Sequence, residues 1–246
     1  MKSSDDILIS VAIAISYRRA SIDMLCRSIE SMLNQSYSNI EILICENNSV
    51  MEAKAYLQAI ADTDNRIQIV DGIGADTQAE KLNRCISIAS GEFIARMDDD
   101  DYSEFDRLEK QLRFLLSNTH ISFVGSNITI VQDGLPVGIR TLPEYPLIRD
   151  FYFVQPFIHS ALLFRKSAVV AVGGYRQTDD CVGCEDYDLL LRLYEKGYFG
   201  ANIQETLLWY TIPSIGKTNR TLHMRINEVK TRWIRFSSLG LMPKTI

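Results

Sequence analysis

The stretch "FIARMDDDDYS", residues 93–103, joins an apolar run to four consecutive carboxylates. Residues 93–97 have the composition of a buried strand, and the aspartates 98–101 follow without a break. Carboxylates this close repel one another, and each resists ionisation beside the others. Two interpretations follow: a solvated turn before the helix expected near Glu104, or a site where a cation relieves the repulsion.

The segments before this stretch alternate between the periodicities of strand and helix. Residues 7–16 form a near-continuous apolar run, and residues 21–35 carry apolar side chains at helical spacing, with Ser21 as the expected N-cap. Further strands are expected over 40–49, 66–70 and 92–97, and further helices over 52–62 and, after a Gly-rich turn, within 72–90. Such alternation predicts an α/β fold with a mainly parallel central sheet and helices on both faces.

After residue 120 the rhythm changes. Residues 121–131 and 159–165 are expected to form strands, and residues 133–138 have the composition of a turn. A helix is expected from residue 186 and ends at Gly197. With no internal repeat, low-complexity stretch or clear linker, the sequence predicts one domain with two halves.

Composition limits the classes of function. The chain has 246 residues, 46% of them hydrophobic, and a net charge of −5, which argues against non-specific binding to nucleic acid. Its five cysteines are scattered, and three lie in apolar periodic segments, as expected in a reducing, cytoplasmic setting. The opening "MKSSDD" is acidic where a signal peptide would be basic, and no apolar run approaches the ~20 residues that span a bilayer.

The position of the acidic run favours the cation. In open α/β sheets, ligands gather at the carboxyl ends of the strands. Mg²⁺ or Mn²⁺ binds through one or two carboxylates together with substrate phosphates. Four aspartates at a strand end therefore predict a cation that holds a nucleotide.

Five segments in order resemble the family 2 glycosyltransferases of GT-A fold, over about residues 7–210. They are "VAIAISYRRAS" (11–21), "SIESMLNQSYSNIEILICENNS" (28–49), "KLNRCISIASGEFIARMDDDDYSEFDRLEKQ" (81–111), "HSALLFRKSAVVAVGGYR" (159–176) and "EDYDLLLRLYEKG" (185–197). The resemblance implies a single GT-A-like (Rossmann-like) domain over 1–246. Its parts would be a nucleotide-binding half over about 1–115, an acceptor and catalytic half over about 116–210, and a C-terminal extension over 211–246.

The resemblance also implies a reaction. It is the metal-dependent transfer of a sugar from a nucleoside-diphosphate donor to an acceptor hydroxyl, with inversion at the anomeric carbon. Asp98 and Asp100 would form the family's Asp-x-Asp element, with Asp100 binding Mg²⁺ or Mn²⁺ and Asp98 or Asp99 bonding the ribose. Tyr17 would pack on the base, or is an ordinary aromatic residue at a strand end.

After the second expected strand the chain departs from the family pattern of two aspartates. It has Glu46 and Asn47, followed by Asn48 and Ser49. Glu46 retains a carboxylate, and the Asn47 amide can still donate to and accept from uracil. The resemblance implies a UDP-sugar donor, and the departure at Asn47 weakens the support for it. The alternative for Asn47 is an Asx-turn.

The segment 72–83 has two interpretations. In the family it borders the donor, with Lys81 and Asn83 near the sugar and diphosphate. Gly72 and Gly74 also imitate a dinucleotide-binding fingerprint, but the third fingerprint position is Thr77 and the preceding strand is third in order, not first.

The pair Glu185–Asp186 precedes an expected helix. The resemblance implies that Asp186 is the catalytic base, whereas its alternative is a helix N-cap. Glu185 and His159 are expected on the acceptor side, although a lone histidine is more often structural. Cys181 and Cys184 lack a second pair for zinc and are expected in an acceptor-side loop.

Residues 225–242 mix basic, aromatic and aliphatic side chains. They predict either a packed C-terminal helix or an interfacial helix that seeks anionic lipid. By resemblance, bacterial family members of this size build surface polysaccharides, so the acceptor is expected to be a glycan or lipid-linked, with peripheral contact at the inner membrane face. The oligomeric state stays open.

Two other functions stay open. A sugar nucleotidyltransferase would need a Gly-rich phosphate loop near the N-terminus, and residues 14–21 contain no glycine. A non-catalytic protein that binds sugar nucleotides has one point in its favour, the replacement of a base-reading aspartate by Asn47.

Overall fold

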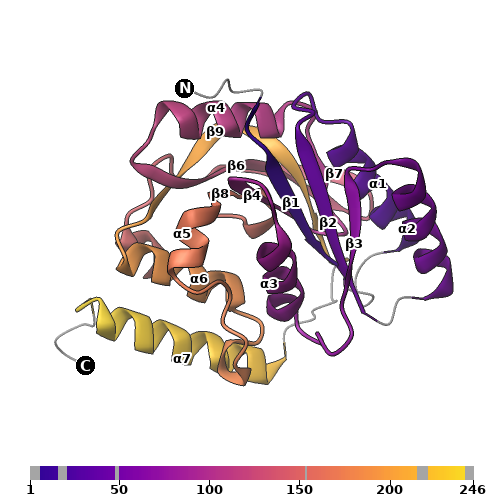
Figure 1. The fold of residues 1–246 in the computed structure, drawn as a ribbon. Helices are drawn as coiled ribbons and strands as arrows, with labels where there is room; N and C mark the ends of the chain where they lie inside the picture. Colours follow the sequence, from indigo (N-terminus) through magenta and orange to yellow (C-terminus); the bar gives the residue numbers. More distant parts are fainter. Residues whose placement is uncertain (1–5, 16–20, 48–49, 153, 215–220, 242–246) are drawn as a thin grey trace.

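The computed structural model describes residues 6–15, 21–47, 50–152, 154–214 and 221–241. Within these ranges nine strands form one curled sheet, in the order β3-β2-β1-β4-β8-β6-β9-β5, with β7 paired to β6 (Figure 1). This confirms the α/β fold class. The sheet runs through both halves of the chain.

The first four strands are parallel, as the alternation predicted. Strand β1 pairs with β2 and with β4, and β2 pairs with β3. The expected strands and helices are all present, as β1 (Ile9–Ala14), α1 (Ile22–Leu33), β2 (Ile40–Glu46), α2 (Met51–Thr63), β3 (Ile67–Asp71), α3 (Gln78–Ile88) and β4 (Phe93–Met97). Ser21 caps α1 as predicted, because its side chain accepts from the Met24 N–H at 3.3 Å.

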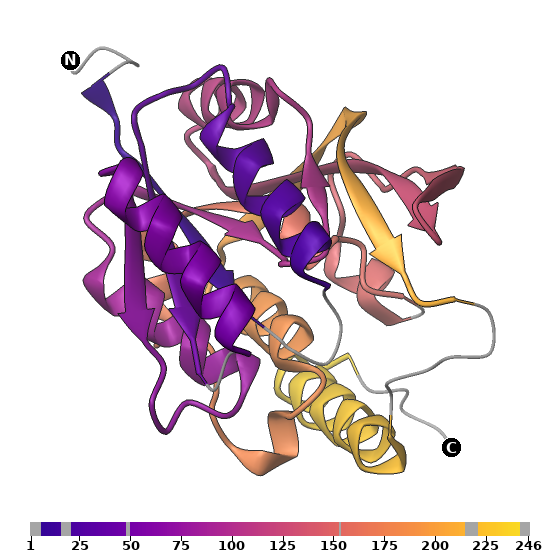
Figure 2. The same cartoon turned by 90° about the vertical axis from the view of Figure 1, so that its right-hand side faces the viewer.

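Helices cover both faces of the sheet because the strands are apolar on both sides. On β1, Ile9, Val11 and Ile13 join the core under α1, α2 and α4 (Arg107–Ser117). Ala12 and Ala14 join the opposite core under α3, α5 (Lys166–Ala171) and α6 (Glu185–Glu195). The view in Figure 2 shows the α1 and α2 face of this three-layer arrangement.

The second half of the sheet is mixed. Strand β8 (Leu163–Arg165) is antiparallel to both β4 and β6 (Ile121–Gln132), whereas β6 runs parallel to β9 (Phe199–Ile212). The strand expected from residue 159 begins later, because His159–Ala161 is a 3₁₀ turn in which the Ala161 N–H bonds to the Ile158 carbonyl at 3.0 Å.

Other elements of this half were not expected from the sequence. The turn-like residues 133–138 are a tight turn at Asp133 and Gly134, both with positive φ, that leads into β7 (Leu135–Arg140). The two-residue strand β5 (Tyr102–Ser103), the short α5 and the 14-residue β9 were also missed.

The C-terminal helix α7 (Leu222–Ser238) packs beside α6, at the end of the molecule opposite α4 (Figures 1 and 2). Phe236 is buried and its ring lies 4.6 Å from that of Tyr152. The packed-helix interpretation of residues 225–242 thus holds for one side of the helix. Within the described ranges, no helix has both the length and the apolar character needed to cross a bilayer.

Candidate active site

Three aspartates converge just beyond the end of β4. Oxygen atoms of Asp98, Asp100 and Asp101 all lie within 4.8 Å of one another. Asp99 is separate from them and 3% exposed. An all-oxygen set of this size suits a hard divalent cation such as Mg²⁺ or Mn²⁺, so these residues fit the ion that the sequence predicted.

Two buried arginines lie behind these carboxylates. Arg96 forms an ion pair with Asp98, and Arg107 donates to the Ser160 carbonyl at 2.8 Å. Burial lowers the pKa of Arg107 to about 10, and burial likewise opposes the charge of Arg96, but the nearby Asp98 raises the Arg96 pKa above its usual value. Both guanidinium groups therefore stay positive at neutral pH and offset part of the repulsion.

The end of β9 fixes the acidic run from the other side. The Thr211 N–H donates to Asp101 Oδ1 at 2.8 Å, and the Thr211 hydroxyl donates to the Asp100 carbonyl at 2.6 Å. Burial, together with repulsion from Asp98 and Asp100, raises the pKa of Asp101 well above its usual range. Its Oδ2 is buried with no hydrogen-bond partner of ordinary geometry among the described residues.

Sequence reasoning gave Asp101 no role. The only sequence signal was its membership of the acidic run, because the partner that turns it inward lies 110 residues away on β9.

Asp186 is the second residue of α6, and the N-cap is Cys184, so the expected capping role is wrong. The Asp186 carboxylate instead accepts from its neighbour's N–H, Tyr187 N to Oδ1 at 2.8 Å, and from Gln155 Nε2 to Oδ2 at 2.9 Å. The helix N-terminus adds a favourable dipole for a negative group. Gln155 was not singled out in the sequence.

The charges of both Asp186 and the acidic cluster act on His159. Its Nε2 contacts the Tyr175 hydroxyl at 2.6 Å. Burial and the charge of Arg96 lower its pKa to about 4, while Asp186 and Asp98 act in the opposite direction. The imidazole is therefore neutral at pH 7.

Asn83, expected near the sugar and diphosphate, holds the backbone of Tyr175. Its Nδ2 donates to the Tyr175 carbonyl at 2.7 Å, and its Oδ1 accepts from the Tyr175 N–H at 2.9 Å. Asn83 thus positions the tyrosine that contacts His159.

Lys81 is buried, and its ammonium donates to the Ile15 carbonyl at 2.8 Å, just past the end of β1. Tyr17 lies outside the described residues. Glu46 is half-buried at the end of β2, and Glu185 is half-buried as the first residue of α6.

Asn47 holds the turn between β3 and α3, because its Nδ2 donates to the Ala75 carbonyl at 3.1 Å and to Asp76 Oδ1 at 3.2 Å. Gly72 in that turn lies against β2, so closely that a Cβ there would be 2.1 Å from the Glu46 carbonyl oxygen. The glycine is explained by this close approach and needs no dinucleotide.

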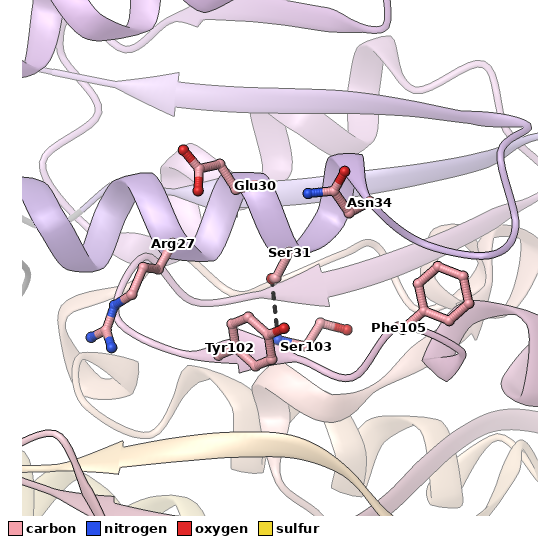
Figure 3. A pocket seen from close by; sticks show the side chains of 7 residues that line it. All are labelled: Arg27, Glu30, Ser31, Asn34, Tyr102, Ser103 and Phe105. Carbon is pink, nitrogen blue, oxygen red and sulfur yellow. Dashed lines mark hydrogen bonds between the residues drawn. The ribbon is translucent and has the colours of Figure 1, made fainter.

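A small pocket of about 210 Å³ opens between α1 and β5, next along the chain from the acidic run (Figure 3). The Ser103 N–H donates to Ser31 Oγ at 3.1 Å, and this hydrogen bond joins the β5 side of the pocket to the α1 side. Tyr102 and Phe105 are exposed at its border. Its lining residues are Arg27, Glu30, Ser31, Asn34, Tyr102, Ser103 and Phe105.

The family model described as "Glycosyl transferase family 2" matches residues 11–172. The chain belongs to this family. It is 37% identical to the putative glycosyltransferase EpsE of Bacillus subtilis over 74% of this chain and 66% of that protein. It is 33% identical to the O-antigen biosynthesis glycosyltransferase WbnJ of Escherichia coli, over 83% of this chain and 80% of WbnJ.

A third relative has a more specific name. It is the Escherichia coli UDP-Glc:alpha-D-GlcNAc-diphosphoundecaprenol beta-1,3-glucosyltransferase WfgD, 33% identical over 57% of this chain and 53% of WfgD. The matched region of this chain therefore spans only part of EpsE and WfgD.

Solved structures confirm the GT-A-like fold. The mannosyltransferase PcManGT of Pyrobaculum calidifontis, solved with GDP-Man and Mn²⁺, is similar with a TM-score of 0.65 and 16% identity, over 96% of this chain and 65% of that one. S. aureus TarS 1-349, solved with UDP-GlcNAc, gives a TM-score of 0.69 and 15% identity, over 95% of this chain and 66% of that one.

Proposed function

We propose that this chain transfers a sugar from a nucleoside-diphosphate donor to an acceptor hydroxyl, with a divalent cation and with inversion at the anomeric carbon. The observation that carries the proposal is the convergence of Asp98, Asp100 and Asp101 at the end of β4, where their oxygen atoms lie within 4.8 Å of one another. Burial raises the pKa of Tyr210, and the charges of Asp98, Asp101, Asp100 and Asp186 raise it further. The charges of Asp186 and of the acidic cluster thus act on the same side chain, Tyr210.

The roles follow from chemistry and position. Asp186 accepts the proton of the attacking hydroxyl, and its two fixed hydrogen bonds hold the carboxylate in one orientation. Asp100 holds the cation with Asp98 and Asp101 beside it, and Asp98 or Asp99 contacts the ribose. When bound, the cation supplies positive charge against that growing on the departing diphosphate.

The proposed donor is a UDP-sugar. Asn47 directly follows β2, and while its Nδ2 holds the turn before α3, its Oδ1 can accept from the N3–H of a uracil. Tyr17, Glu46 and Lys81 complete the proposed donor side, and Asn83 acts through Tyr175. WfgD, with UDP-Glc in its name, and TarS, solved with UDP-GlcNAc, support uridine, whereas PcManGT was solved with GDP-Man.

The proposed acceptor is a lipid-diphosphate-linked glycan used for surface polysaccharide. The names of WbnJ and WfgD support it. His159 and Glu185 form the acceptor side in this proposal. The reaction would then take place at the inner face of the membrane that holds the lipid.

A thermal-shift screen with Mn²⁺ tests the donor, because a ligand that binds only the folded state raises the melting temperature. UDP and UDP-sugars should give larger shifts than GDP, ADP or CDP, and the shift should vanish with a chelator. Release of UDP from the preferred donor, with an acceptor supplied, then tests transfer. A metal-dependent shift without any turnover would favour a non-catalytic binding protein instead.

A further inference from the structure

Helix α7 differs from an ordinary surface helix, because two of its three buried residues, Asn227 and Thr231, are polar and only Phe236 is apolar. Polar contacts hold much of its protein-facing side: Asn227 Nδ2 donates to the Asp179 carbonyl at 2.7 Å, and Arg235 forms an ion pair with the fully buried Asp188 at 2.9 Å. An amphipathic helix usually turns its apolar side chains inward. In α7, by contrast, five large apolar side chains are exposed: Leu222, Ile226, Val229, Trp233 and Ile234.

Four apolar side chains form a stripe on the outward side of α7. They recur at intervals of four, three and four residues, which places them on one side of a helix over about 16 Å. All are exposed in the isolated chain: Leu222 by 74%, Ile226 by 44%, Val229 by 66% and Trp233 by 59%. A contiguous exposed stripe of this kind marks a docking surface.

Basic side chains border this stripe. At 100° per residue, exposed Arg225 and Lys230 fall on its two sides. Glu228 is the one acidic residue within Leu222–Ser238. It forms an ion pair with Arg232 at 2.8 Å on the packed side of the helix. The outward side of α7 is thus positive although the chain carries a net charge of −5. This charge pattern, with an indole suited to the headgroup region, complements an anionic lipid surface.

We propose that the stripe of Leu222, Ile226, Val229 and Trp233 docks α7 in the headgroup region of an anionic bilayer. The inference goes beyond the proposed transfer, since docking needs neither donor nor acceptor. The N-terminal part of α7 contacts the loop that leads to the proposed base, because Asn227 also donates to the Val182 carbonyl at 3.2 Å. Docking through α7 would therefore hold the loop that precedes Asp186 directly behind the helix that meets the lipid.

Co-sedimentation with vesicles tests the proposal. The full chain should sediment with vesicles that contain phosphatidylglycerol, and far less with phosphatidylcholine alone. High salt should release it, since screening weakens the charge attraction. The double change Arg225→Gln and Lys230→Gln should weaken binding about 30-fold, because each basic side chain near such a surface contributes about a factor of five.

Matched substitutions distinguish the effect of a new charge within the stripe from that of a new charge elsewhere on the surface. Val229→Glu should abolish sedimentation, whereas Val170→Glu on α5, where the valine is 56% exposed, should leave it unchanged. Unaltered melting temperatures of both variants show that the fold persists.

Two outcomes would overturn the proposal. One is equal sedimentation of Val229→Glu and the unchanged chain, or none by either. The other is a dimer in analytical ultracentrifugation that the Val229→Glu substitution dissociates, together with no binding of the unchanged chain to vesicles. A second copy of the chain would then cover the stripe.

Discussion

At the scale of single residues, the orientation of Asp186 is set by two donors from different parts of the chain. One is the next N–H of its own helix, and the other is the side chain of Gln155, 31 residues earlier. The first is available to any residue with an acceptor oxygen at position 186. The second depends on where residues 154–156 are placed by the second half of the fold.

Asp186→Asn should retain donor binding and lose transfer. The amide oxygen can still accept from the Tyr187 N–H, but the group cannot take up a proton. General bases contribute about 10²–10⁴-fold, so the rate should fall by at least about a hundredfold. Donor affinity by calorimetry and turnover with acceptor provide the check, and a rate within about tenfold of the parent would exclude Asp186 as the base.

Gln155→Leu should lower kcat with little change in donor affinity. Leucine fills similar space but leaves Asp186 Oδ2 without its 2.9 Å donor, so the base loses its fixed orientation. We expect a loss of roughly tenfold, the equivalent of about one hydrogen bond to a charged group. Gln58→Leu on α2, where the amide contacts only Asp62 at 2.8 Å among the contacts described, is the control. An unchanged kcat would mean that Gln155 has no positioning role.

Asp100→Ala should abolish metal-dependent donor binding and leave the fold intact. Removing one of several repelling carboxylates should not destabilise the chain, because the remaining ones repel less. Calorimetry of UDP with Mn²⁺ measures the effect, and Asp62→Ala, an exposed aspartate on α2, is the matched control. Equal affinities of Asp100→Ala and the parent would remove Asp100 from the cation site.

At the scale of elements, the turn between β3 and α3 depends on one close approach. Gly72→Ala places a methyl group 2.1 Å from a carbonyl oxygen of β2, so the turn must move. Overpacking of this kind costs about 1–3 kcal/mol of unfolding free energy. Gly138→Ala in β7 is the control, because its Cβ would meet no atom within 4 Å.

Denaturant unfolding of the two glycine variants decides the point. The shift in Asn47, which holds this turn, should also weaken donor binding in Gly72→Ala. Equal stability of both variants would show that the turn relaxes without cost.

The first-half elements were predictable because each carries one clear periodicity, as the apolar run of β1 and the helical spacing of α1 show. Strand β9 was not predictable in this way. Its burial changes from buried to exposed and back within Phe199–Ile212, since its pairing with β6 is interrupted by register shifts and it pairs with β5 only at Leu208 and Trp209. No single alternation describes a strand with such different neighbours.

The same distinction applies to the site. Asp98, Asp100 and Asp186 could be proposed from the sequence because family segments carry them as local motifs. Asp101 and Gln155 were missed, since what makes them special is a contact with a residue far away in the chain. Sequence patterns report on neighbours along the chain, and such contacts arise only when the sheet has formed.

At the scale of the whole molecule, stability should fall between pH 7 and pH 5 because of His159. Its pKa is about 4 when folded, against 6.5 as the ordinary value, since burial and Arg96 disfavour the charged form. A folded pKa below the unfolded one means that the stabilisation is complete above about pH 6.5 and is lost as the pH falls toward 4.

Thermal melting of the parent and of His159→Asn at pH 7 and pH 5 measures this contribution. The variant has no imidazole to protonate, so its melting temperature should fall less on acidification, while all other groups contribute equally to both proteins. Parallel losses in the two proteins would show that His159 is not the titrating group.

The two guanidinium groups behind the acidic cluster have a consequence for how the protein is made and handled. Arg96 and Arg107 are covalent parts of the chain, so the counter-charge is present as soon as the polypeptide is synthesised. Folding then does not have to wait for a metal. If the proposed cation is required for transfer, purification in a chelator should yield folded, inactive protein that regains activity when the ion is restored.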